Sequence, residues 1–203
     1  MAGNGPTTEI EIQSNAALLL GKSPFTTIDN ADKFAVSVQK LYDMLVPAEL
    51  GSNAWKFAKK QVQLSQIAGF DPDFAEYEAS YALPGDMLNI VRLYPMVWYQ
   101  IFENRLYTGT TGELKMEYTY NAPVVSWNPA FKAYMTATIA YQMCLSITEN
   151  PQLMQMLGGL VKQYRAQAMY LDGQNSPNRG IASSPWIAVR GGRYNRPGSV
   201  GIR

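Results

Sequence analysis

Residues 129–172, PAFKAYMTATIAYQMCLSITENPQLMQMLGGLVKQYRAQAMYLD, decide the fold that we expect for this chain. They contain two long apolar runs with one break between them, at residues 149–151. The first run has no charge between Lys132 and Glu149, Asn128 can cap it, and Pro129 suits a first helical turn. Small residues recur along it at Ala130, Ala133, Ala137, Ala140 and Cys144. A helix apolar on nearly all sides lies inside a bundle, and its small-residue face lets another helix approach.

The second run predicts an amphipathic helix after the break. Its apolar positions follow helical spacing at Leu153, Leu157, Leu160, Val161, Tyr164, Ala168 and Leu171. The adjacent Gly158 and Gly159 cost about 1 kcal/mol each relative to alanine. We therefore expect another backbone or a neighbouring subunit to come close at this pair.

Neither run suits a membrane, although the first is long enough to cross one. Polar side chains interrupt its centre, among them Thr136, Gln142 and Ser146. Residues 1–8 carry no signal peptide, because they lack a basic start and an apolar stretch. We expect a protein assembled in the cytoplasm with no membrane partner.

Two further helices are predicted before residue 51. The first spans residues 9–20, has acids in its opening turn and stops at Gly21. The second starts with Asp29 or Asn30 as its cap and reaches about Leu50, with a kink or end at Pro47. Residues 9–50 and 129–172 would together form a bundle of about four helices.

Residues 51–128 have a different pattern, which predicts a β-rich insertion. Leu114, Met116, Tyr118 and Tyr120 alternate with more polar neighbours, as in a half-buried antiparallel strand. Shorter β-forming runs occupy residues 90–93, 97–102 and 106–108, whereas residues 56–67 are compatible with a helix as well as a strand. The predicted class is α+β: a helical bundle with an antiparallel β-rich insertion and an extended C-terminal tail.

Residues 173–203 form the tail and hold five arginines without an acidic residue. Because the whole chain has 17 basic and 16 acidic residues, residues 1–172 keep 12 basic against 16 acidic ones. A basic arm with an apolar island on an acidic body points to partner binding, since Trp and Arg dominate binding hot spots. The candidate contact residues are Arg179, Trp186, Ile187, Val189, Arg190, Arg193, Tyr194, Arg196 and Arg203.

The sequence offers little for catalysis. It has no histidine, no phosphate-binding glycine motif and no nucleophile elbow, and its one cysteine, Cys144, lies in the apolar run as an expected buried thiol. We expect no enzyme activity and no cofactor. The densest acidic group is Asp71, Asp73, Glu76 and Glu78. Its oxygen ligands allow a metal-dependent hydrolase or nuclease as one alternative, although a solvated loop explains them more simply.

Nucleic-acid binding is the other alternative. Aromatic residues interleaved with basic ones can hold single strands, and the basic tail offers phosphate contacts. Most aromatic residues, however, lie in the β-rich part beside acids, where sheet core or subunit contacts explain them. A binding module of this kind would lose affinity for DNA steeply as salt rises.

A series of landmarks across residues 10–172 resembles the tail tubular protein A family, the head-to-tail adaptors of short-tailed bacteriophages. The landmarks are Asn15-Ala16-Ala17-Leu18, Leu20-Gly21, Pro24, Tyr42, Trp55-Lys56-Phe57-Ala58, Tyr81-Ala82-Leu83-Pro84-Gly85-Asp86-Met87-Leu88, Tyr118 and Trp127-Asn128-Pro129-Ala130-Phe131. The arginine-rich tail and the Gly158-Gly159 pair depart from the family pattern.

The resemblance implies a structural virion protein at the head-tail junction. It implies a dodecameric ring between the portal protein and the tail nozzle protein, with DNA as passing cargo and tail fibres as further partners. No catalysis is implied. Combined with the charge and the apolar island of the tail, it leads to the hypothesis that the arm around Trp186 docks on the portal.

Overall fold

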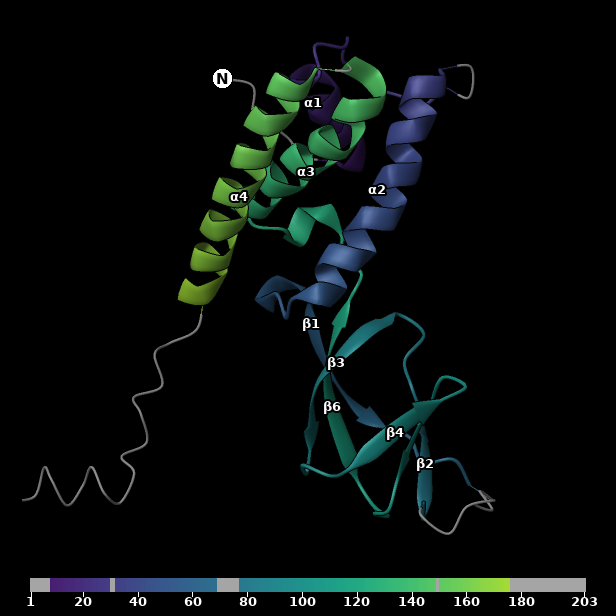
Figure 1. Cartoon of the computed structure of the whole chain (residues 1–203). Helices are drawn as coiled ribbons and strands as arrows, with labels where there is room; N and C mark the ends of the chain where they lie inside the picture. Colours follow the sequence, from purple (N-terminus) through teal and green to yellow (C-terminus); the bar gives the residue numbers. More distant parts are fainter. Residues whose placement is uncertain (1–7, 30–31, 69–76, 149, 176–203) are drawn as a thin grey trace, which may run out of the picture.

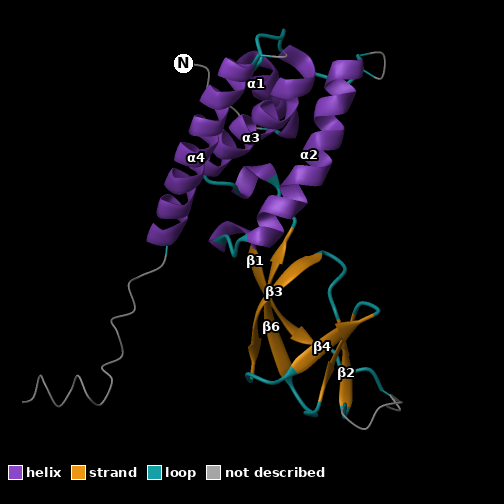
Figure 2. Cartoon of the chain, viewed as in Figure 1, coloured by secondary structure: helices purple, strands orange, loops and turns teal. Residues whose placement is uncertain are grey.

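Helices and sheets occupy opposite ends of the molecule (Figures 1 and 2). The computed structural model describes residues 8–29, 32–68, 77–148 and 150–175. Within these ranges, four α-helices form a bundle, and two three-stranded antiparallel sheets are inserted between the second and third helices. The predicted α+β class with a β-rich insertion is confirmed. The predicted extended tail falls almost entirely outside the described residues.

The first helix, α1 (Glu9–Leu19), begins and ends where local chemistry dictates. Thr8 and Glu11 form a capping box, in which Glu11 N–H donates to Thr8 Oγ1 at 3.3 Å and Thr8 N–H donates to Glu11 Oε2 at 3.0 Å. Gly21 follows the helix with φ 71°, a left-handed conformation that glycine adopts without strain. The predicted stop at Gly21 is confirmed.

The second helix, α2 (Lys33–Ser52), starts later than predicted and ends close to the predicted Leu50. Its cap is Asp32, whose Oδ1 accepts from Phe34 N–H at 2.9 Å, while Asp29 lies in the preceding turn. The helix also continues through Pro47, so of the two outcomes expected at that residue, a kink or an end, the end is wrong. Val46 and Leu50, on either side of Pro47, are buried in the core. Their burial offsets the roughly 3 kcal/mol that an interior proline costs.

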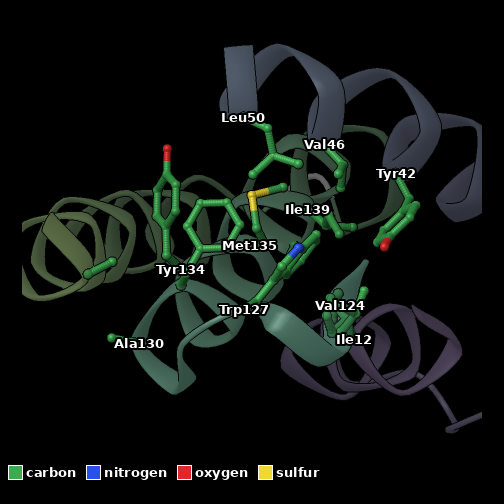
Figure 3. Packing of buried hydrophobic residues seen from close by; sticks show 14 of the residues in the cluster. Ile12, Tyr42, Val46, Leu50, Val124, Trp127, Ala130, Tyr134, Met135 and Ile139 are labelled. Atoms are coloured by element: carbon green, nitrogen blue, oxygen red, sulfur yellow. The ribbon is translucent and has the colours of Figure 1, made fainter. Parts of the chain in front are cut away.

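The third helix, α3 (Pro129–Thr148), is the predicted central helix. Asn128 Oδ1 accepts from Phe131 N–H at 2.7 Å at its start, and α3 contacts α1, α2 and α4. The ring of Phe131 lies 4.8 Å from that of Trp55 and 4.9 Å from that of Trp127, centre to centre. Figure 3 shows the core around Trp127, with side chains from α1, α2 and α3 directed toward one another.

The fourth helix, α4 (Pro151–Gln174), lies against α3 and is capped by Asn150. A Cβ atom added at Gly158 would stand 3.3 Å from Tyr141 Cε2 of α3, whereas one added at Gly159 would meet nothing within 4 Å. Close approach within the fold therefore explains Gly158 but not Gly159. The helix also covers Gly173 and Gln174, which the sequence assigned to the tail.

One sheet has the strand order β1 (Lys59–Leu64), β6 (Leu114–Tyr120), β3 (Met87–Tyr94). Its middle strand β6 is the predicted alternating strand, because Leu114, Met116 and Tyr118 are buried. Thr119 is buried too, against the expected alternation, and its Oγ1 donates to Asn89 O at 3.3 Å. The ambiguous residues 56–67 contain a short 3-10 helix, Lys56–Ala58, followed by β1.

The other sheet has the order β2 (Ala79–Ala82), β5 (Arg105–Thr108), β4 (Tyr99–Phe102). Strands β4 and β5 form a hairpin whose two turn residues, Glu103 and Asn104, have φ values of 46° and 59°. Positive φ at both central residues matches the right-handed twist of paired strands. Tyr81 and Leu106 are buried between the two sheets in a second hydrophobic cluster, separate from the helical core.

Candidate functional site

The predicted arm cannot be placed, since Arg179, Trp186, Ile187, Val189, Arg190, Arg193, Tyr194, Arg196 and Arg203 all lie outside the described residues. The end of α4, from which the arm continues, is held by specific hydrogen bonds. The buried carboxylate of Asp172, near the end of α4, accepts the backbone N–H of Lys56 at 3.0 and 3.1 Å from its two oxygens. Lys56 Nζ also donates to Gly173 O at 2.7 Å. These bonds tie the end of α4 to the segment that leads into β1.

The acidic cluster gains no structural support as a metal site. Asp71, Asp73 and Glu76 lie outside the described residues, whereas Glu78 is placed next to β2 with its N–H donating to Thr108 O at 3.0 Å. In the described part of the chain, no three acidic or cysteine side chains gather closely enough to hold a metal ion. The alternative of a metal-dependent hydrolase stays a prediction without geometry behind it.

The prediction that Cys144 is a buried thiol is confirmed. Its Sγ lies 3.2 Å from Thr148 Oγ1, one turn later in α3, and the side chain belongs to the core of the bundle. A thiol without access to solvent or a nearby base has no route to reactivity.

Two ion pairs stabilise the β1–β6–β3 sheet, one between neighbouring strands β1 and β6 and one between β1 and the turn before β3. Lys59 Nζ lies 3.0 Å from Glu117 Oε1, and this hydrogen bond lowers the pKa of the Glu117 carboxyl. Lys60 Nζ lies 2.6 Å from Asp86 Oδ2, and that contact lowers the pKa of Asp86 and raises that of Lys60. Burial, followed by the bond to Asp86, raises the pKa of Tyr118. These charges are satisfied in pairs and form a structural network.

A polar hollow of about 470 Å³ lies beside Pro47, between α2 and the segment after β6. Burial raises the pKa of Tyr42, one of its lining residues, and the carboxylates of Glu9 and Asp43 add to that effect. The phenol is thereby kept neutral. The described residues that line this hollow include no Lys or Arg, so no cation lies there to lower the pKa of the phenol and activate it.

The helical bundle also carries a larger and more apolar groove, of about 530 Å³. It runs between α1, α3 and α4, with Leu18, Leu19, Ala133, Leu160 and Tyr164 among its lining residues. Leu18 and Leu19 are 51% and 38% exposed, so they add apolar surface at its rim.

The most concentrated exposed apolar surface lies on residues 94–102. In the described part of the chain, 14 large hydrophobic side chains are exposed, and six of them belong to this segment: Tyr94, Met96, Trp98, Tyr99, Ile101 and Phe102. The ring of Trp98 stacks on that of Tyr77 at 5.6 Å, with 3° between their planes. Tyr77 in turn contacts the rings of Phe102 and Tyr107.

The sequence of this segment also indicates an exposed apolar surface, an indication that was not used when the segment was predicted only as a strand. Residues 95–102, PMVWYQIF, have one polar side chain in eight positions, so they lack the alternation of a strand with one face in water. In a two-sheet structure this small, such a segment has more apolar surface than the core can cover.

Several landmarks of the family resemblance have structural roles in the bundle and at its junction with the sheets. The indole N–H of Trp55 donates to Glu49 O at 3.1 Å, and that of Trp127 donates to Ala122 O at 2.8 Å. Asp86 accepts from both Lys60 and Tyr118. The two indole bonds lie in the helical core and its link to the sheets, and the bonds of Asp86 lie within the β-rich part.

No family model matches the chain, and the search of curated proteins gave no match. Among the described helices, none combines the length and the apolar character that crossing a bilayer requires.

Proposed function

We propose that the protein is a ring-forming adaptor that joins a phage portal to its tail nozzle and lets DNA pass. In this role it is a structural component of the virion tail, located at the head-tail junction and assembled in the host cytoplasm. It has no catalytic task. Its partners are further copies of itself, the portal and nozzle proteins and, as a further candidate, tail fibres.

The observation that carries the proposal is the unpartnered apolar surface of a single copy. Segment 94–102 leaves six large hydrophobic side chains exposed, and α4 adds Met156, Met169 and Tyr170 at 56%, 48% and 67% exposure. Contiguous apolar patches on soluble proteins mark interaction sites. The two regions belong to different parts of the molecule, as a subunit that contacts neighbours on two sides requires.

Two further points support the adaptor role. The fold has the two helical pairs and the β-rich insertion that the resemblance implies. Residues 1–172 carry 16 acids against 12 basic residues, a balance suited to a channel wall that must not bind passing DNA tightly.

Electron microscopy of the purified full chain, alone and mixed with the portal protein of the same virus, tests the proposal. We expect rings of high rotational symmetry, with twelve copies, in at least one of the two samples. A chain that stays monomeric and ignores the portal would contradict the adaptor role. Binding to free DNA that weakens steeply with salt would then favour the nucleic-acid module.

A further inference from the structure

We infer that the exposed edge of β4 is the surface through which one copy of this chain contacts the next. The inference depends on the proposed function in one respect: it takes the neighbouring copy to be part of the same ring. The argument begins with the outer edges of the two sheets, because an unpaired edge is a template for association.

Three of the four outer edges carry a feature that discourages association. Strand β1 has Lys59 and Lys60 at its start, and β3 has register shifts near Met87 and Ile90. Lysines and bulges are devices by which sheets protect their edges. Strand β2 is covered by the chain itself, since Ile67 N–H donates to Ser80 O at 2.9 Å and Ala82 N–H to Ser65 O at 3.1 Å.

Strand β4 has none of these features. It reads Tyr99-Gln100-Ile101-Phe102, without a charge, proline or bulge, and its register with β5 is regular. In antiparallel pairing, every second residue directs its N–H and C=O groups away from the partner strand. Among the described residues, no backbone hydrogen bond reaches that outer edge.

The side chains around this edge supply the area that an interface needs. Tyr94, Met96, Trp98, Tyr99, Ile101 and Phe102 are on average about half exposed. Side chains of this size carry roughly 150–250 Å² each, so the six present roughly 450–750 Å² of apolar surface. A standard interface buries about 800 Å² on each partner. We call these six residues the β4 edge patch. Successive strand residues face opposite ways, so a neighbour gains most of that area by contacting the side chains on both faces of the edge.

A second copy is the occupant that these features favour. The six residues of the β4 edge patch are uncharged and mostly aromatic, as subunit contacts are. Two arginines lie at its border, Arg92 against Tyr94 and Arg105 opposite Phe102. Two β4 edges paired with each other would close a two-fold dimer, so in a ring β4 must meet a different surface of its neighbour.

The first experiment compares the assembly of the full chain with that of Ile101→Lys. Ile101 is 43% exposed, so lysine can extend into solvent in the monomer but would bring a charge into the contact. Leu145→Lys is the matched control, because Leu145 is an exposed apolar side chain, at 63%, on α3 and outside the β4 edge patch. Ile101→Thr serves as a second variant that keeps a β-branched residue in the strand.

We expect analytical ultracentrifugation to show self-association weakened at least 30-fold by Ile101→Lys and little changed by Leu145→Lys. If the wild-type chain assembles only on the portal protein, the comparison is made there by electron microscopy. Rings that form equally well with Ile101→Lys, in a folded protein, would overturn the inference and leave the adaptor role intact. A wild-type oligomer that is not a ring but dissociates with Ile101→Lys would support the β4 contact and contradict the adaptor role. A wild-type chain that never self-associates would overturn both.

A cysteine at position 101 tests the geometry of the contact. The chain has one native cysteine and it is buried, so Ile101→Cys introduces the reactive thiol. A disulfide requires Cα atoms within about 7 Å. We expect no disulfide-linked dimer in assembled Ile101→Cys protein. Efficient disulfide formation would show two β4 strands facing each other and overturn the ring contact inferred here.

Discussion

At the scale of single residues, Asp172 is the clearest case of one side chain holding two parts of the molecule together. It is 7% exposed, and both of its carboxylate oxygens face the backbone N–H of Lys56, 116 positions earlier in the chain. No local pattern could reveal such a pairing. In the sequence, Asp172 is only the residue at which the predicted amphipathic helix ends.

We expect Asp172→Ala to lower the free energy of unfolding by about 1–3 kcal/mol, because it leaves the Lys56 N–H buried without an acceptor. Asp172→Asn keeps one acceptor oxygen of the same shape, so its loss should be smaller. Urea denaturation followed by circular dichroism measures both. If Ala and Asn cost the same, the charge of the carboxylate rather than its role as an acceptor would be responsible.

At the scale of elements, the sequence predicted those parts whose pattern is set by their own residues. Helix α3 and strand β6 were found because an apolar helix and an alternating strand have characteristic periods, and the start of α1 and the stop at Gly21 follow from local chemistry. Strand β2 was missed because Ala79, Ser80 and Tyr81 are all buried and show no alternation.

Other errors arose where tertiary contacts outweigh local preference. Helix α2 crosses Pro47 because its flanking turns are anchored in the core, and burial of this kind is not visible in the sequence around a proline. The exposed side of β4 was missed for a related reason. The apolar run was recognised as a strand, but only the sheet order places that strand at an open edge.

The glycine pair of α4 yields a prediction at this scale, because the two positions differ in their surroundings. Gly159→Ala meets no atom within 4 Å in the monomer, so it should stabilise the isolated chain by about 0.5–1 kcal/mol. Gly158→Ala would press against the ring of Tyr141 at 3.3 Å, so its gain should be smaller or reversed. Thermal unfolding of the two variants under conditions that keep the chain monomeric measures this difference.

Ring assembly of the same variants tests whether Gly159 lies in a contact with a neighbouring copy. If a second copy approaches α4 at this position, Gly159→Ala will stabilise the monomer and weaken the ring. Equal assembly of Gly159→Ala and wild type would show that the surface around Gly159 remains open in the ring.

At the scale of the whole molecule, the charge of the chain is divided along its length. The body is acidic in balance, and residues 173–203 carry five arginines together with the island Trp186-Ile187-Ala188-Val189. Asp172 and Lys56 fix the end of α4, so the arm leaves every copy at the same place on the body. In a ring, this would repeat the arms around one rim, where many modest contacts reinforce one another.

We therefore expect Trp186→Ala with Arg190→Ala to abolish attachment to the portal protein, because the pair removes an aromatic anchor and a charge from each repeated arm. The body should be unaffected, so the unfolding transition of the variant should match that of the wild type. Asn178→Ala with Asn195→Ala is a matched control, which changes two uncharged residues of the same arm and should leave attachment intact. Co-sedimentation with the portal, at low and at high salt, measures the effect. If the double variant attaches as the wild type does, the arm is not the portal contact, and the groove between α1, α3 and α4 becomes the next surface to test.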